Sequence, residues 1–536
     1  MKGLKLFATG FVAMSALALH VNAEEVTNEA SLNTCIAKNS NVCKLTENIE
    51  LENLIDIKYD ITLDLNGYSI TPKETLKHSG GLVTVIHGGK LTIEDSGENG
   101  KISTGNSGDV WGAVQVTKKG ETDISKKATL VINDGTLEGY SYAVTGNGNP
   151  DRVNTDITIN GGKLIGLDAK ESLGIYHPQD GVLTVNGGEI TGATGIEMRA
   201  GKLNVTGGTI RGTHKPVDVK PNGSGATTYG AGIAVAQHTT QKTIEVKVSN
   251  GVVEGHTALY ESNPQKNSTD AIKNVSIEVT GGTFNAINEG TNAVYSENLT
   301  NFITGGEFNT TVDSTYLVAK STENKTDVYE IETPDGETKY VVVDENKITY
   351  APYEAEEIIS AKEFEEKINK IKEEDLKEEN EKETFIELKK LINGKTIASI
   401  HDITYERFVG ENLVMDGFDE NLQPNKEVEV TVKIPTNLEK VKEDYTRTYY
   451  TIRIHKNDDG IYEVKELKGT DNKDGTVTFK TDKFSTYILT YEDVKATTNP
   501  PTGDNMLVYF AAAVMSVIGL ALTTLRLLKN KSNNIN

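Results

Sequence analysis

The chain has 536 residues, with 78 acidic and 55 basic side chains, which gives a formal net charge of −23 at pH 7. A chain this acidic has no basic surface in bulk, which argues against nucleic acid or anionic lipid as its partner. It contains two cysteines, too few to hold a body of this size together, so the core must be stabilised by burial and hydrogen bonding.

Residues 1–23 have the features of a signal peptide. Lys2 and Lys5 form a charged n-region, residues 6–19 form an apolar h-region, and Val21-Asn22-Ala23 is a small-residue cleavage site. The apolar stretch is too short to span a membrane comfortably. We therefore expect an exported chain whose mature part begins at Glu24.

Residues 24–58 are expected to cap the N-terminal end of the repeat that follows, because an open stack of strands would present unpaired edges. This segment holds Cys35 and Cys43, which are eight positions apart. Outside the membrane such a pair can form a disulfide that closes a small loop, and two free thiols are the alternative.

Residues 59–352 are organised by a repeat of the form apolar-x-apolar-x-Gly-Gly-x-apolar-x-Gly. Its alternation predicts short strands with one buried face, and the glycine pair permits a corner with positive φ. One copy cannot bury its apolar face alone, but stacked copies can, each strand pairing with the same strand of the next copy. The second glycine of the pair falls at Gly135, Gly162, Gly188, Gly208, Gly251, Gly282 and Gly306.

This pattern predicts a mainly β fold, a parallel β-helix or β-solenoid. It resembles the right-handed parallel β-helix of the pectin-lyase-like superfamily over roughly residues 60–310. A β-sandwich array is the alternative, although a sandwich would not reset a glycine corner in every coil. A closing hairpin is expected from residues 328–331 and 340–343 around a Pro334-Asp335-Gly336 turn.

The strands that follow the glycine corners share one outward column of side chains that could hold a site. Glu197 and Arg199 are weak candidates for catalysis, because the resemblance implies relatives that cleave polysaccharides with clustered charges. Flat tyrosine rings favour a ligand-binding surface instead, formed by Tyr176, Glu197, Tyr260 and Tyr295. The full column reads Thr145, Tyr176, Glu197, Ala234, Tyr260 and Tyr295. The histidines are scattered, so neither a metal site nor a cofactor is expected.

Residues 353–492 are expected to form a separate stalk domain, with a helical segment followed by a small α+β or β-sandwich module. Ser360 and Glu363 form a capping box, and Asn393-Gly394 marks the end of a second helical stretch. Strands are expected over 428–434, 449–454, 476–479 and 487–490. Residues 384–492, and the closing segment 474–487 above all, resemble a membrane-proximal β-sandwich module of wall-anchored proteins. This resemblance implies that the domain is a spacer.

The C-terminal tail combines a short motif, an apolar run and a positive end. Residues 506–525 form an uncharged apolar run long enough for a transmembrane helix, and the basic residues of 526–536 indicate a cytoplasmic end. This order of motif, apolar run and basic end resembles the sorting signal of Gram-positive surface proteins. Within the linker 493–505, the residues Asn499, Pro500, Pro501, Thr502 and Gly503 resemble the motif L-P-x-T-G, with Asn in place of Leu.

That resemblance implies cleavage by a sortase between Thr502 and Gly503 and attachment of Thr502 to peptidoglycan at the cell surface. The expected function is therefore that of a wall-anchored adhesin or of a protein that binds glycan or host matrix, not of an enzyme. A surface polysaccharide lyase or glycosidase of the β-helix type and a structural component without a dedicated ligand remain the alternatives. Fold alone does not choose among the three.

Overall fold

The computed structural model describes residues 23–495, apart from residues 107, 122, 149–152, 216, 218–220, 222–224, 353–355, 377, 404, 416–426 and 458–459. The expected signal peptide as far as residue 22, the sorting motif and the apolar run 506–525 lie outside these residues. Within them, no helix has the length and apolar character needed to cross a membrane. Internal contacts divide the chain into two compact units, one of residues up to 351 with 406–419, the other of 352–405 with residues from 420 onward.

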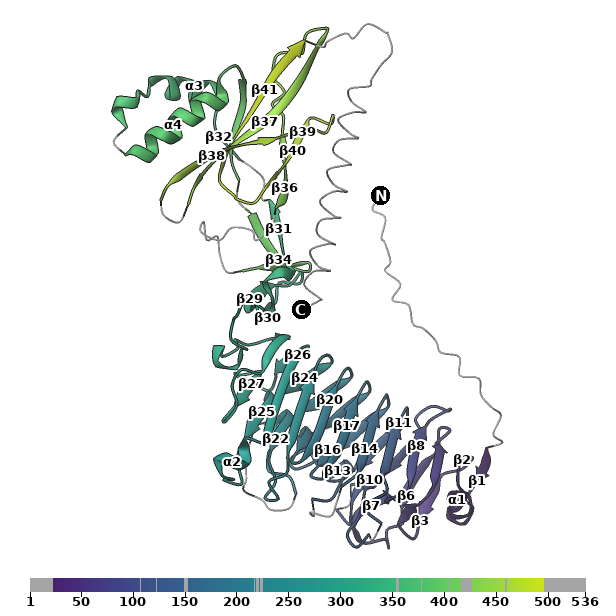
Figure 1. Ribbon diagram of the computed structural model, residues 1–536. Coiled ribbons are helices and arrows are strands. Elements are labelled where there is room, and N and C mark those ends of the chain that lie inside the picture. Colours follow the sequence, from purple (N-terminus) through teal and green to yellow (C-terminus); the bar gives the residue numbers. More distant parts are fainter. Residues whose placement is uncertain are drawn as a thin grey trace, which may run out of the picture. The chain divides into compact units, whose positions relative to one another are not determined.

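The first unit is a stack of short parallel strands, mainly β as expected, in which each coil contributes three strands (Figure 1). The first ladder consists of β1 (Glu24–Val26), β2 (Asn41–Leu45), β5 (Asp60–Asp64), β8 (Lys90–Glu94), β11 (Ala128–Ile132), β14 (Thr155–Ile159), β17 (Gly181–Val185), β20 (Gly201–Val205), β23 (Ile244–Val248) and β26 (Val275–Ala286). The second consists of β3 (Ile49–Leu51), β6 (Ser69–Pro72), β9 (Lys101–Ser103), β12 (Thr136–Gly139), β15 (Lys163–Gly166), β18 (Glu189–Gly192), β21 (Thr209–Gly212), β24 (Val252–Gly255), the end of β26, and β28 (Ile303–Phe308).

The third ladder is a nine-stranded parallel sheet that carries the candidate site. Its strands are β4 (Ile55–Ile57), β7 (His78–Val85), β10 (Val110–Val116), β13 (Tyr142–Thr145), β16 (Leu173–His177), β19 (Thr194–Met198), β22 (Ala231–Ala236), β25 (Thr257–Ser262) and β27 (Val294–Ser296). Parallel strands stacked in this way share one apolar interior, and long columns of Ile, Leu and Val side chains from all three ladders form a single buried cluster.

The glycine pairs turn the corner between the first and second ladders. The glycine at the second position of all seven corners has positive φ, from 78° at Gly162 to 124° at Gly306, as the repeat predicts. The first position is glycine in five of the corners and is Asp134 or Asn250 in the other two. Where it is glycine the approach to the neighbouring coil is close, and a Cβ placed on Gly207 would lie 2.4 Å from the carbonyl oxygen of Asn186.

The N-terminal end differs from the separate cap expected over residues 24–58. Strand β1 already pairs in parallel with β2, and β2, β3 and β4 pair in parallel with β5, β6 and β7, so this range belongs to the stack and β2 to β4 form its first complete coil. No glycine pair marks this first coil, and its strands are very short, so the repeat pattern missed it. Helix α1 (Glu29–Ile36) covers the end, with its N-cap Asn28 accepting a hydrogen bond from the amide of Ser31.

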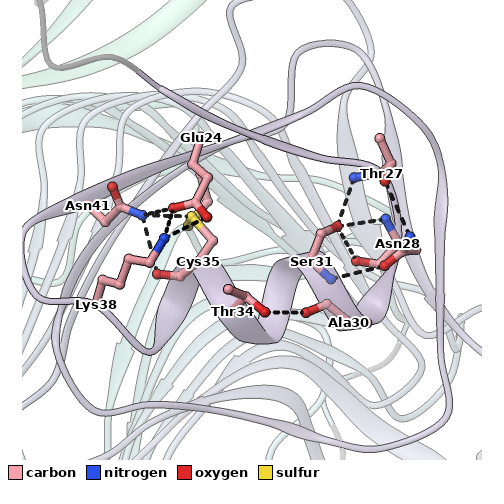
Figure 2. Close-up of a disulfide and its surroundings, with 10 residues drawn as sticks. Glu24, Thr27, Asn28, Ala30, Ser31, Thr34, Cys35, Lys38 and Asn41 are labelled. Carbon is pink, nitrogen blue, oxygen red and sulfur yellow. Dashed lines mark hydrogen bonds and ion pairs between the residues drawn. A yellow bond between two sulfur atoms is a disulfide. The ribbon is translucent and has the colours of Figure 1, made fainter.

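A disulfide joins α1 to the first coil. Cys35 on the helix is bonded to Cys43 on β2, and both side chains are fully buried. Figure 2 shows Glu24, the first residue of β1, beside this bridge. Its carboxylate accepts hydrogen bonds from Lys38 at 2.6 Å and Asn41 at 2.9 Å, so the start of β1 is held against the helix end.

The C-terminal end of the stack is closed by the expected hairpin. Strand β29 (Thr326–Glu332) pairs antiparallel with β30 (Thr338–Asp344), and β30 covers the edge of β28. Antiparallel pairing interrupts the repeat and so ends the parallel stack. The smaller elements of this unit are α2 (Thr269–Ile272), the 3-10 turns η1 (Ser314–Tyr316) and η2 (Glu345–Lys347), and the strands β31 (Ile348–Pro352), β34 (Tyr405–Val409) and β35 (Asn412–Val414).

The second unit has helices on one face of an antiparallel sheet and a smaller antiparallel sheet besides. The five-stranded sheet has the order β32 (Glu356–Ile359), β33 (Thr396–Asp402), β41 (Thr486–Lys495), β37 (Tyr445–Lys456) and β38 (Tyr462–Lys468). Helices α3 (Ala361–Lys370) and α4 (Glu379–Ile392) contribute Ile368 and Leu388 to a core shared with that sheet, and the turn η3 (Glu373–Asp375) lies between them. The three-stranded sheet consists of β36 (Val428–Lys433), β40 (Thr476–Thr481) and β39 (Thr470–Asp471).

Candidate functional site

The register of the nine-stranded sheet places the six residues of the expected outward column in succession. The pairs are Thr145 with Tyr176, Tyr176 with Glu197, Glu197 with Ala234, Ala234 with Tyr260, and Tyr260 with Tyr295. Side chains at equivalent positions of parallel coils project on the same side of the sheet. The column is therefore a real feature of the stack, although only part of it reaches solvent.

The middle of the column is buried, contrary to the expectation of an outward groove at Glu197 and Arg199. Tyr176 is 6% exposed, and Glu197 and Arg199 are 0% exposed. The covering chain is the segment 225–229, which we call the roof segment. It belongs to the long connection between β21 and β22, and the sequence gives this connection no apolar period from which its path could be predicted.

The roof segment is held by hydrogen bonds from side chains of the column. The Glu197 carboxylate accepts the amide of Thr227 at 2.9 Å and also the Thr227 hydroxyl. The Tyr176 hydroxyl donates to the carbonyl of Gly225 at 3.1 Å, and Arg199 donates to that same carbonyl. Arg199 also donates to the carbonyl of Ala236 at 3.3 Å through Nε.

The electrostatics of this buried cluster are set by desolvation. Burial raises the pKa of the Glu197 carboxyl, while the charge of Arg199 and the hydrogen bonds from Thr227 act in the opposite direction. Burial likewise raises the pKa of Tyr176. Under the roof segment, neither Glu197 nor Arg199 is open to a polymeric substrate, so their arrangement serves to position the roof segment.

Beside the roof segment lies an aromatic groove of about 650 Å³, open to solvent. Trp111 of β10 is 47% exposed at this groove. Tyr142 of β13 stacks on Tyr176 of β16, with ring centroids 5.2 Å apart and an interplanar angle of 21°. The other aromatic residues that line the groove are Tyr140 and, from the roof segment, Tyr229.

The stacked rings of Tyr142 and Tyr176 form one side of the groove. Tyr142 pairs in the register with Leu173, but its ring stacks on Tyr176, three residues further along β16. The glycines that precede Tyr142 in the register leave no space, because a Cβ on Gly112 would lie 3.1 Å from Cγ2 of Thr145 and one on Gly81 would lie 2.5 Å from Cβ of Gln115. The stacked tyrosines and the exposed ring of Trp111 offer aromatic surface to a planar or ring-shaped ligand.

Polar groups complete the lining of the groove. Gln115 is fixed by two hydrogen bonds, donating to the carbonyl of Thr117 at 2.7 Å and accepting the amide of Gly81 at 3.0 Å. The other polar side chains are those of Ser141, Thr145, Asn147, Asp168, Glu171 and His238. Aromatic rings beside hydrogen-bonding side chains are the kinds of group found in small-molecule and sugar sites.

The far end of the column forms a second, smaller aromatic surface. Tyr260 and Tyr295 stack with ring centroids 5.1 Å apart and an interplanar angle of 19°, and Tyr295 is 39% exposed. The predicted tyrosines are therefore divided into two places, with Tyr176 in the wall of the groove and the other two beyond the buried part of the column. Among the described residues, no group of three or more His, Cys, Asp and Glu side chains is placed to hold a metal ion.

The repeat pattern does not single out Trp111, Tyr140, Tyr142 or Tyr229, which all line the groove. Trp111 is the single tryptophan of the chain, and it stands three residues before the core valine Val114 on an amphipathic strand. That was a usable signal for an exposed aromatic residue. Comparisons with protein-family models, with curated proteins and with solved structures found no match to this chain.

Proposed function

We propose that the chain is an exported surface protein, anchored to the cell wall through Thr502, that binds a glycan of the host or matrix in the aromatic groove. In this proposal the first unit is a right-handed parallel β-helix of the pectin-lyase-like type, and the second unit is its stalk. The support for anchoring is the order of motif, apolar run and basic end in the tail. Sortase and peptidoglycan are the partners that this order implies.

The observation that carries glycan binding is the exposed ring of Trp111 in the aromatic wall of the groove. Trp111 keeps 47% of its surface in water beside the stacked Tyr142, although burial of a tryptophan is among the larger favourable terms in folding. Sugar rings have an apolar C–H face and a rim of hydroxyls. The groove offers rings for the face and amide, hydroxyl and carboxylate groups for the rim.

One test addresses binding and a separate test addresses display. The full chain, purified in mild detergent, should be retained on immobilised glycans without releasing products, and Trp111→Ala should weaken the retention. Thr502→Ala should move the protein from the wall fraction to the membrane fraction. Wall attachment that survives this change would refute the proposed anchoring without affecting the proposed groove.

A polysaccharide-cleaving enzyme is the second candidate function, and two carboxylates in the groove favour it. Asp168 and Glu171 both line the groove, and pairs of carboxyl groups carry out glycoside hydrolysis. Released oligosaccharides that disappear in Asp168→Asn, with retention unchanged, would establish the enzyme. A structural component without a ligand predicts neither retention nor products.

A further inference from the structure

We infer that the groove selects uncharged glycans and rejects those that carry carboxylate or sulfate groups. This inference rests on the proposed function and specifies the chemical class of the ligand. It concerns the groove between Trp111, Tyr142 and the roof segment, and it follows from the charges and the aromatic rings that line it.

The charged side chains in the lining of the groove are negative. Among the lining residues that the structure describes, Asp168 and Glu171 are acidic and none is lysine or arginine. Anionic sugars are usually bound by Arg or Lys, because a desolvated carboxylate or sulfate needs a charge-assisted donor. Here an anionic sugar would meet carboxylates of its own sign on a chain whose net charge is −23.

The aromatic wall supplies the attraction for an uncharged ligand. Tyr142 and Trp111 both line the groove, and Trp111 keeps 47% of its surface exposed. Stacking of a sugar ring on such faces buries apolar area and does not need a charge on the ligand. Gln115 also lines the groove, and its side-chain amide is held in one orientation by hydrogen bonds to Gly81 and Thr117.

Carboxylates in the lining are compatible with an uncharged sugar. The Asp168 side chain accepts a hydrogen bond from the amide of Lys170 at 2.9 Å, which orients it at the start of its turn. A carboxylate accepts several hydrogen bonds, so sugar hydroxyls can donate to it directly. The same group that repels a uronate therefore helps to orient a neutral hexose.

The test compares matched glycans and matched variants of the full chain in detergent. The glycans are dextran, mannan and galactan against polygalacturonate and heparin, together with one mucin before and after removal of its sialic acid. The variants are Trp111→Ala, with Tyr59→Ala and Tyr462→Ala as controls, because both control tyrosines are exposed, at 42% and 40%, and neither lines the groove.

The expected result is retention on at least one neutral glycan, stronger binding to the desialylated mucin, and roughly tenfold weaker binding in Trp111→Ala only. Raising the salt concentration to 1 M, where the Debye length falls to ~3 Å, should leave retention unchanged. Retention on acidic glycans that is lost in Trp111→Ala would overturn this inference and leave the groove as the binding site. Retention that is absent or insensitive to Trp111→Ala would overturn the proposed function as well.

Discussion

The hydroxyl of Thr227 provides a direct measure of how firmly the roof segment is held. Thr227→Val keeps the shape of the side chain and the backbone amide that donates to Glu197, and removes only the hydroxyl that the carboxylate also binds. Glu197 is 0% exposed, so water cannot replace the lost partner. A hydrogen bond to a charged or buried group contributes ~1–3 kcal/mol, so local opening should become roughly 5- to 150-fold more frequent.

Thr228 supplies the matched control next to it. Its side chain is also 0% exposed, but its hydroxyl has no hydrogen-bond partner. Thr228→Val therefore removes a buried hydroxyl that contributes no hydrogen bond, and we expect the stability of the roof segment to be unchanged or slightly increased. Both substitutions replace a hydroxyl group by a methyl group at adjacent positions. Only the hydroxyl of Thr227 donates a hydrogen bond to Glu197.

Native-state hydrogen exchange is the appropriate assay, because it reports the opening of a single segment rather than unfolding of the whole chain. The amide of Thr227, which is bound to Glu197, should lose protection in Thr227→Val and keep it in Thr228→Val. Equal loss in both variants would mean that side-chain packing, not the hydrogen bond, holds the roof segment. No loss in Thr227→Val would refute the role given to the Glu197 carboxylate.

Three further predictions concern pH, the glycine corners and the disulfide. Because burial raises the pKa of Glu197 above its ordinary value of 4.5, the folded chain holds this proton longer than the unfolded chain. The contribution of Glu197 to the free energy of unfolding should therefore fall as pH rises above about 4.5 and level off above the pKa of the folded state. Glu197→Gln, measured over the same pH range, should lack this pH dependence. Gly208→Ala should destabilise by ~1–3 kcal/mol more than Gly336→Ala in urea unfolding. Both glycines have φ near +82°, but a Cβ meets backbone at 2.8 Å in the first and nothing within 4 Å in the second, so equal effects would contradict the role of the corner. Replacing Cys35 and Cys43 together by Ser should cost ~2–3 kcal/mol and expose the first coil to protease, whereas a wild-type stability insensitive to reductant would count against the bridge.

The parts of the fold that repeat were predictable from the sequence. A glycine marks the corner in seven successive coils because the second corner position has positive φ, which glycine adopts without strain. The order of the outward column followed from the same repeat, because fixing one strand of each coil fixes the register of the others. The closing hairpin was predictable from the turn at Pro334-Asp335-Gly336 between two apolar strands.

The parts of the site that do not repeat were not predictable. The roof segment covers Glu197 through contacts 30 residues apart in the chain, and nothing in its own composition indicates which coil it crosses. Exposure of Glu197 and Arg199 was therefore predicted wrongly, although their place in the coils was right. The aromatic groove joins Trp111, Tyr142 and Tyr229 from three separate parts of the chain, and their proximity depends on how the connections between coils fold.

The roof segment also changes how the stack should come apart. In a stack whose coils contact only their neighbours, each coil can detach from its neighbour in turn, and cooperativity is limited to adjacent pairs. Here one stretch of five residues is bound by Tyr176 on β16, by Glu197 on β19 and by Arg199, which also reaches the carbonyl of Ala236 on β22. These hydrogen bonds join three coils, which we therefore expect to unfold together. Unfolding that proceeds coil by coil from either end should become more cooperative when it reaches these three coils beside the groove.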